Sequence, residues 1–100
     1  MIYSISINEL LKKGKDAYII DIRSNQSYNN NHIPNSKNIP SQTLISNHSK
    51  YLDKNTTYYI YCQKGSSSIK VCSILNNLGY KTINVNGGYE AWILSDNSYD

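Results

Sequence analysis

The chain has 100 residues, a net charge of +3 and a hydrophobic content of 39%. This length suits a single domain with one core, which is expected over residues 1–100. A membrane span needs about 20 apolar residues, and no apolar run of this chain approaches that length. The lysines are dispersed along the chain, which argues against a nucleic-acid-binding protein, and no signal peptide is recognisable at the start.

The amino-terminal third predicts a short helix, a buried strand and a polar loop. Ser6 and Glu9 have the spacing of a capping box, so a short helix is expected to follow Ser6 and to end at Gly14. Residues 17–22 form a short apolar run, as is typical of a buried parallel strand. Residues 23–36 are polar and rich in amides, and predict a loop that can include one helical turn.

The middle of the chain predicts two more strands with a helix between them. Residues 38–39 are a minimal strand that ends at Pro40. Residues 41–52 are expected to form one weak helix, and residues 58–61, which are β-branched or aromatic, form the next strand.

The last third predicts a helix, a strand and a closing helix. A helix is expected over residues 68–78 with Gly79 as its stop, and one apolar face is assigned to Ile69, Cys72, Leu75 and Leu78. A strand over 82–85, a turn at Gly87–Gly88 and a helix over 89–94 follow, and residues 96–100 are expected to be a frayed tail. Strands that alternate with helices indicate an α/β domain with a mainly parallel sheet.

The two cysteines predict no disulfide framework. Cys62 and Cys72 lie ten positions apart, and a helix between them would separate them along its axis. A reducing, cytoplasmic location is therefore expected. Neither cysteine is paired with His32 or His48 at a spacing typical of metal ligands, so neither a metal site nor a cofactor is predicted.

Cys62 is the strongest candidate for a catalytic residue. It ends the run Thr-Tyr-Tyr-Ile-Tyr at 57–61 and opens the segment Cys-Gln-Lys-Gly-Ser-Ser-Ser at 62–68, directly before the helical pattern. A strand, a short loop and a helix start would bring backbone N–H groups and the positive end of a helix dipole to the sulfur. Both effects favour the thiolate, which is the nucleophilic form of cysteine.

The rest of this loop is predicted to bind an anionic substrate. Loop N–H groups can form an anion nest, and Gly65 permits a tight turn close to the sulfur. Lys64 adds positive charge, and the serines offer hydroxyl donors or a helix cap. The candidate substrate-binding residues are Gln63, Lys64, Gly65, Ser66, Ser67 and Ser68.

Four short strings in order make the chain similar to a known family. They are Ile-Asp-Ile-Arg at 20–23, His-Ile-Pro at 32–34 leading to Asn-Ile-Pro at 38–40, Tyr-Cys-Gln-Lys-Gly at 61–65, and Asn-Gly-Gly-Tyr-Glu-Ala-Trp at 86–92. Over nearly its whole length the chain resembles the single-domain rhodaneses, a sulfurtransferase family. The resemblance implies a rhodanese-like α/β fold, with a central, mainly parallel five-stranded sheet flanked by helices on both faces and the cysteine loop at the carboxyl end of a strand.

The same resemblance implies a function and its partners. A sulfane sulfur would pass from thiosulfate or a persulfide donor to cyanide or a thiol through a Cys62 persulfide. The expected partners are a small anionic sulfur donor, a thiol or cyanide acceptor, and a protein persulfide as a further candidate. Asp21, Arg23 and His32 are candidate supporting residues; a structural ion pair is the favoured interpretation for Asp21 and Arg23, and a turn-fixing hydrogen bond for His32.

Two departures from family patterns leave alternatives open. Many rhodaneses carry an arginine near the place of Ser67, whereas Arg23 is the single arginine of this chain, so thiosulfate and persulfide donors are equally plausible. The related cysteine-dependent phosphatases and arsenate reductases need arginine six positions after the cysteine, where this chain has Ser68. A non-catalytic binding or regulatory module is the other alternative.

Overall fold

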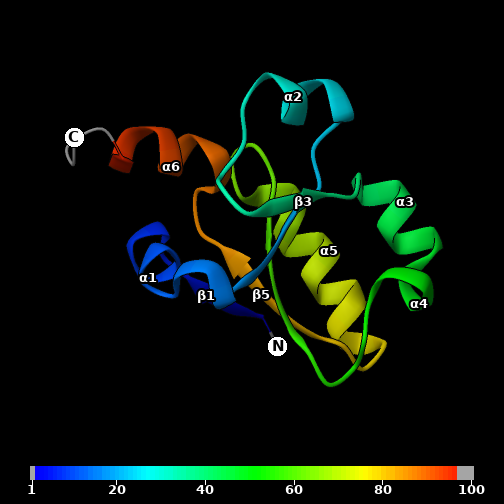
Figure 1. Cartoon of the computed structure of the whole chain (residues 1–100). Helices are drawn as coiled ribbons and strands as arrows, with labels where there is room; N and C mark the ends of the chain where they lie inside the picture. Colours follow the sequence, from blue (N-terminus) through cyan, green and yellow to red (C-terminus); the bar gives the residue numbers. More distant parts are fainter. Residues whose placement is uncertain (1, 97–100) are drawn as a thin grey trace.

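The computed structural model describes residues 2–96, and over these residues five strands form one sheet. The strands are β1 (Tyr3–Ile5), β2 (Tyr18–Asp21), β3 (Ser36–Asn38), β4 (Thr57–Tyr61) and β5 (Lys81–Val85). Their order in the sheet is β1-β5-β4-β2-β3, and each neighbouring pair is parallel (Figure 1). The α/β fold with a five-stranded parallel sheet is therefore confirmed.

Helices cover both faces of this sheet. They are α1 (Ile7–Lys12), the 3-10 helix η1 (Gly14–Asp16), α2 (Asn25–Asn30), α3 (Ser41–Ser46), α4 (His48–Tyr51), α5 (Ser66–Asn77) and α6 (Gly88–Asp96). In Figure 1 α1 and α6 lie on one side of the sheet, and α3, α4 and α5 lie on the other. Among the described residues no helix is both long and apolar enough to span a membrane.

The central strand β4 supplies both hydrophobic cores because successive side chains of a strand point to opposite faces. Tyr58 and Ile60 pack in the core that contains Cys72 and Leu75 of α5. Tyr59 and Tyr61 belong to the core on the side of α1 and α6. A strand that is buried on both faces explains the continuous apolar run at these positions.

Strand β1 is the strand that the sequence patterns did not locate. It pairs with β5 through Tyr3 and Ile83, Ser4 and Asn84, and Ile5 and Val85. Of its three residues Ile5 alone is buried, so the strand carries no hydrophobic alternation that a sequence pattern could show. Its position at the sheet edge supplies the missing fifth strand.

Two helix assignments need correction. Residues 41–52 form two helices, α3 and α4, because the backbone at Asn47 leaves the helical region (φ −130°, ψ 35°). The apolar face assigned to α5 is correct for Cys72 and Leu75 and wrong for Ile69 and Leu78, which are exposed. Three-residue steps drift by about 60° each around a helix with 3.6 residues per turn, so they do not stay on one face. The face that α5 buries consists of Ser68, Val71, Cys72 and Leu75.

The predicted helix signals are otherwise present. Ser6 Oγ accepts from the Glu9 N–H at 3.1 Å and the Glu9 carboxylate accepts from the Ser6 N–H at 3.3 Å, which is a complete capping box. Gly14 and Gly79 have positive φ just after α1 and α5. Of the predicted frayed tail, Asp96 is the last residue of α6, and residues 97–100 lie outside the described residues.

The buried thiol of Cys72 is expected to resist alkylation. Burial raises the pKa of the Cys72 thiol to about 11, so near pH 8 it stays protonated. Iodoacetamide should therefore leave Cys72 unmodified in the folded protein and modify it in urea, which peptide mass spectrometry can measure. Equal modification rates with and without urea would contradict this burial.

Candidate active site

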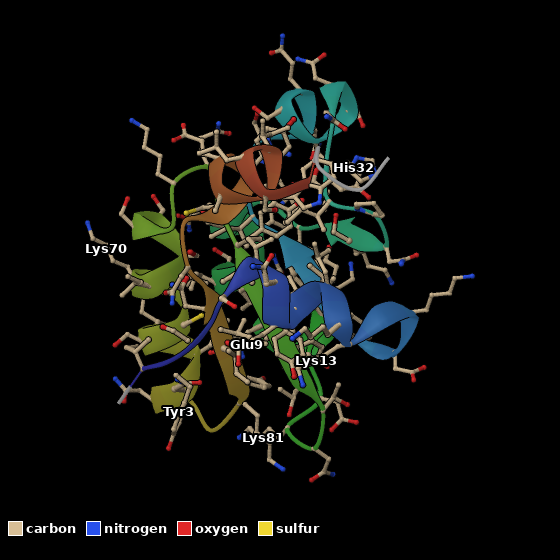
Figure 2. All side chains as sticks on the ribbon, turned by 90° about the vertical axis from the view of Figure 1, so that its left-hand side faces the viewer. Tyr3, Glu9, Lys13, His32, Lys70 and Lys81 are labelled. Atoms are coloured by element: carbon tan, nitrogen blue, oxygen red, sulfur yellow. The ribbon has the colours of Figure 1, made fainter. Side chains whose placement is uncertain are left out.

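Cys62 lies at the carboxyl end of the sheet, directly after β4. Because the strands are parallel, the ends of β2 and β5 reach the same edge, where α/β proteins commonly bind ligands. Helices α2 and α6 both lie at this end (Figure 1). Figure 2 shows His32 at this end as well, whereas Tyr3 and Lys81 lie at the opposite end of the molecule.

Backbone amides converge on the Cys62 sulfur. The N–H groups of Gly65 and Ser68 donate to Sγ at 3.1 Å and 3.2 Å. The Ser68 hydroxyl lies 3.3 Å from the same sulfur, and the Cys62 residue is 6% exposed. The two N–H groups direct positive partial charge at the sulfur, which stabilises an anion there, and the Ser68 hydroxyl oxygen accepts from the thiol.

The other predicted loop residues lie at the surface around this sulfur site. Gln63, Lys64, Ser66 and Ser67 are exposed, and none of them donates to Sγ. Within residues 2–96 the Lys64 ammonium makes no ion pair, so it remains available to an anion. Of the six predicted loop residues, Gly65 and Ser68 therefore contact the sulfur, and the other four form an exposed rim around it.

Ser68 is held in place by a residue that sequence patterns did not single out. Its hydroxyl donates to Asn84 Oδ1 and lies 3.2 Å from the Gly65 carbonyl oxygen. Asn84 is buried in β5, and its Nδ2 donates to Asn86 Oδ1 at 3.4 Å. An asparagine between the apolar residues Ile83 and Val85 of a strand is the signal that could have pointed to this role, because a buried amide needs hydrogen-bond partners.

The first residues of α6 hold the cysteine loop in place through hydrogen bonds. The N–H groups of Tyr89 and Glu90 donate to the carbonyl oxygens of Cys62 (2.9 Å) and Gln63 (3.0 Å). The first N–H groups of a helix have no partner within the helix, and here the loop carbonyls supply one. With these two carbonyls bound to α6, the following loop amides face the sulfur.

Two glycines permit this close approach. A Cβ added to Gly88 would lie 2.2 Å from the Cys62 carbonyl oxygen, and one added to Gly65 would lie 2.9 Å from the Gly87 nitrogen. Gly65 also has φ +99°, a conformation that residues with a Cβ rarely adopt. Gly88, expected as part of a turn, is therefore also a contact residue of the cysteine loop.

Arg23 ties the neighbouring segments to this loop. It forms an ion pair of 2.8 Å with Asp21, whose side chain is fully buried. Its other donors reach Gln63 Oε1 at 3.3 Å and the Asn31 carbonyl at 2.7 Å, and its guanidinium lies 4.1 Å from the Tyr89 ring centroid. Burial lowers the pKa of Arg23, but the hydrogen bond and charge of Asp21 outweigh this effect and raise it above the ordinary value.

His32 contacts α2 and is not brought to the sulfur. Its Nδ1 lies 2.8 Å from the Tyr28 carbonyl oxygen, and its ring stacks on the Tyr28 ring with centroids 3.7 Å apart. No hydrogen bond joins it to the cysteine loop within the described part of the chain. Across residues 2–96, no three histidine, cysteine, aspartate or glutamate residues are grouped as metal ligands would be.

Comparison with known proteins places these features in a family. The chain matches the Rhodanese-like domain family over residues 6–95. It is 32% identical over 91 residues to YtwF of Bacillus subtilis, named as a candidate sulfurtransferase, covering 91% of this chain and 87% of that protein. It is 35% identical over 85 residues to the thiosulfate sulfurtransferase GlpE of Coxiella burnetii, covering 84% of this chain and 78% of GlpE.

A solved structure agrees with these relatives. A rhodanese-like domain protein from Staphylococcus aureus superimposes with a TM-score of 0.84 at 36% sequence identity, covering 91% of each chain. This superposition agrees with the α/β fold described above.

Proposed function

Since the chain belongs to the rhodanese-like domain family, we propose that it transfers a sulfane sulfur through a persulfide on Cys62. Proteins named as sulfurtransferases are among its relatives, so the chain belongs to a sulfurtransferase family. The observation that supports a role for Cys62 is the convergence of the Gly65 and Ser68 amides on its sulfur.

In the proposed first step the Cys62 thiolate attacks the outer sulfur of the donor. A new S–S bond forms between Cys62 and that sulfur, the donor's S–S bond breaks, and its electron pair leaves with sulfite or a thiolate. The terminal sulfur of the persulfide is anionic, and the positive partial charge of the amides around the adjoining Sγ would stabilise it. A second nucleophile, cyanide or a thiol, then removes the terminal sulfur.

The residues of the loop have different proposed roles. Gly65 and Ser68 would hold the sulfur through their amides, while the exposed Lys64 would attract an anionic donor. Gln63, Ser66 and Ser67 would form the rim that the donor crosses. Asp21 and Arg23 would support the loop from the end of β2, and His32 would fix the turn before β3.

The proposal extends to the partners. Thiosulfate and a persulfide are the donor classes, a protein-bound persulfide included, and cyanide or a thiol is the acceptor. Both cysteines are free, as this chemistry requires of Cys62, and we propose a reducing cytoplasmic location for the protein.

A phosphatase or arsenate reductase is less compatible with the position of Ser68. At the place where such enzymes carry arginine, the buried Ser68 side chain points to Sγ and Asn84. This serine brings no positive charge to the bound anion. A purely non-catalytic module would not need two amides directed at a cysteine sulfur.

Intact-mass spectrometry tests the proposal. The protein is incubated with thiosulfate and, separately, with an organic persulfide, and the Cys62→Ser variant is treated in parallel. We expect the wild type to gain one sulfur atom and the variant to gain none, and cyanide or a thiol should remove the added sulfur. The ratio of loading rates ranks the two donors.

Two controls limit other interpretations. Cys72→Ala should load as the wild type does, because the second thiol is fully buried in the core. A folded wild-type protein that neither donor loads would contradict the proposal, and hydrolysis of a phosphate ester by that protein would favour the phosphatase alternative.

A further inference from the structure

A hollow lies beside the cysteine loop on α6. It has a volume of about 380 Å³ and is lined by Gln63, Tyr89, Glu90, Ile93 and Leu94. Ile93 is 43% exposed and Leu94 is 78% exposed. Two aliphatic side chains on the surface next to a reactive loop form an apolar wall that the fold itself does not require.

This hollow adjoins the cysteine loop at Gln63 and Tyr89. Gln63 is the residue after the cysteine, and it both lines the hollow and accepts from Arg23. Tyr89 also lines the hollow, and its backbone N–H donates to the Cys62 carbonyl. A donor group that extends from Cys62 past Gln63 would therefore reach α6.

The charges around the hollow favour a donor with few negative charges. Glu90 is the charged residue of the lining, and its carboxylate accepts from Gln63 Nε2 at 3.4 Å. The nearby Arg23 has its donors directed at Asp21, Gln63 and Asn31, so it is not free to bind a sulfonate. A carboxylate beside an apolar wall repels a dianion and accepts an uncharged organic group.

From these features we infer that the hollow binds the apolar substituent of an organic sulfur donor. The donor class is a persulfide or thiosulfonate in which the sulfane sulfur carries the negative charge and an aromatic or aliphatic group extends over Ile93 and Leu94. The inference rests on the proposed function and specifies its substrate class. It separates the anionic end, which the loop amides hold, from the apolar end, which α6 holds.

Two thiosulfonates that differ in this apolar group test the inference. Benzenethiosulfonate and methanethiosulfonate anions both transfer their outer sulfur: the Cys62 thiolate forms a new S–S bond, the donor's S–S bond breaks, and a sulfinate leaves with the electron pair. Loading rates are measured by intact mass, and each is divided by the rate of the same donor with a small free thiol. This division removes the difference in leaving-group reactivity.

We expect the corrected rate for the benzene donor to exceed that for the methane donor on the order of tenfold, as burial of part of a phenyl ring would give. Ile93→Ser should lower this preference several-fold and leave the methane donor unchanged. Ile74→Ser is the matched control, because Ile74 is 44% exposed on α5 and does not line the hollow. It should leave both rates unchanged.

The outcomes separate this inference from the proposed function. If both donors load normally and the wild type and Ile93→Ser show the same preference for the benzene donor, the hollow is not a subsite. The sulfur transfer proposed for Cys62 would then still stand. A failure of both donors to load the wild type would remove the sulfurtransferase proposal and this inference with it. A dimer in the wild type that Ile93→Ser dissociates would show that a second copy of the chain covers the hollow, which also overturns the inference.

Discussion

Gly88→Ala should destabilise the protein by about 2–5 kcal/mol and strongly reduce the sulfur loading of Cys62. The added Cβ would lie 2.2 Å from the Cys62 carbonyl oxygen and 3.1 Å from the Gln63 carbonyl oxygen. Relief of these contacts requires α6 to move away from the loop, which breaks the hydrogen bonds from Tyr89 and Glu90. Urea unfolding measures the stability, and intact mass measures the loading.

Gly14→Ala is the matched control for this change. Gly14 and Gly88 both have positive φ, +66° and +58°, but an added Cβ at Gly14 meets no atom within 4 Å. The control should therefore show the backbone cost alone, roughly 1–2 kcal/mol, with normal loading. Equal losses of stability and loading in the two variants would refute the role assigned to the contact between Gly88 and the cysteine loop.

Arg23→Leu should cost about 3–5 kcal/mol, because it leaves the Asp21 carboxylate buried without its cation. The change also removes the donors to Gln63 and to the Asn31 carbonyl, so the cysteine loop loses a support along with the ion pair. The free energy of unfolding from urea titration measures the effect. Loading of Cys62 should fall as well.

Two further variants separate the buried charge from the lost side chain. The double variant Asp21→Asn with Arg23→Leu should recover a large part of the stability, because no unpaired charge remains inside. Lys13→Leu removes an exposed cation that lies 5.6 Å from the Tyr59 ring centroid, and should change the stability by less than about 0.5 kcal/mol. A loss for Arg23→Leu no larger than that for Lys13→Leu would disprove a structural role of the ion pair.

The features that sequence patterns predicted correctly depend on neighbouring residues. The capping box of Ser6 and Glu9 needs two side chains three positions apart, and the structure contains it. The strand before Cys62 and the glycine after α5 are likewise local signals. The placement of loop amides around the cysteine sulfur was also accessible, because strand, loop and helix start follow one another without a gap.

The features that sequence patterns missed depend on contacts between distant segments. Strand β1 exists as a pairing with β5, about 80 residues later in the chain, and has little hydrophobic pattern of its own. The contact of Gly88 with the Cys62 carbonyl and the hydrogen bond between Asn84 and Ser68 join different elements.

The amino-acid sequence by itself determined four of the five strands, the glycine stops after α1 and α5, and a cysteine at a strand-to-helix turn, because each follows from residue type and spacing within about ten positions. Tertiary structure alone decided which distant groups hold the cysteine loop in place. The start of α6 binds the loop carbonyls, β5 supplies Asn84, and Arg23 reaches the loop from β2. These contacts arise because parallel strands bring their carboxyl ends to one edge, however far apart those ends lie in the chain.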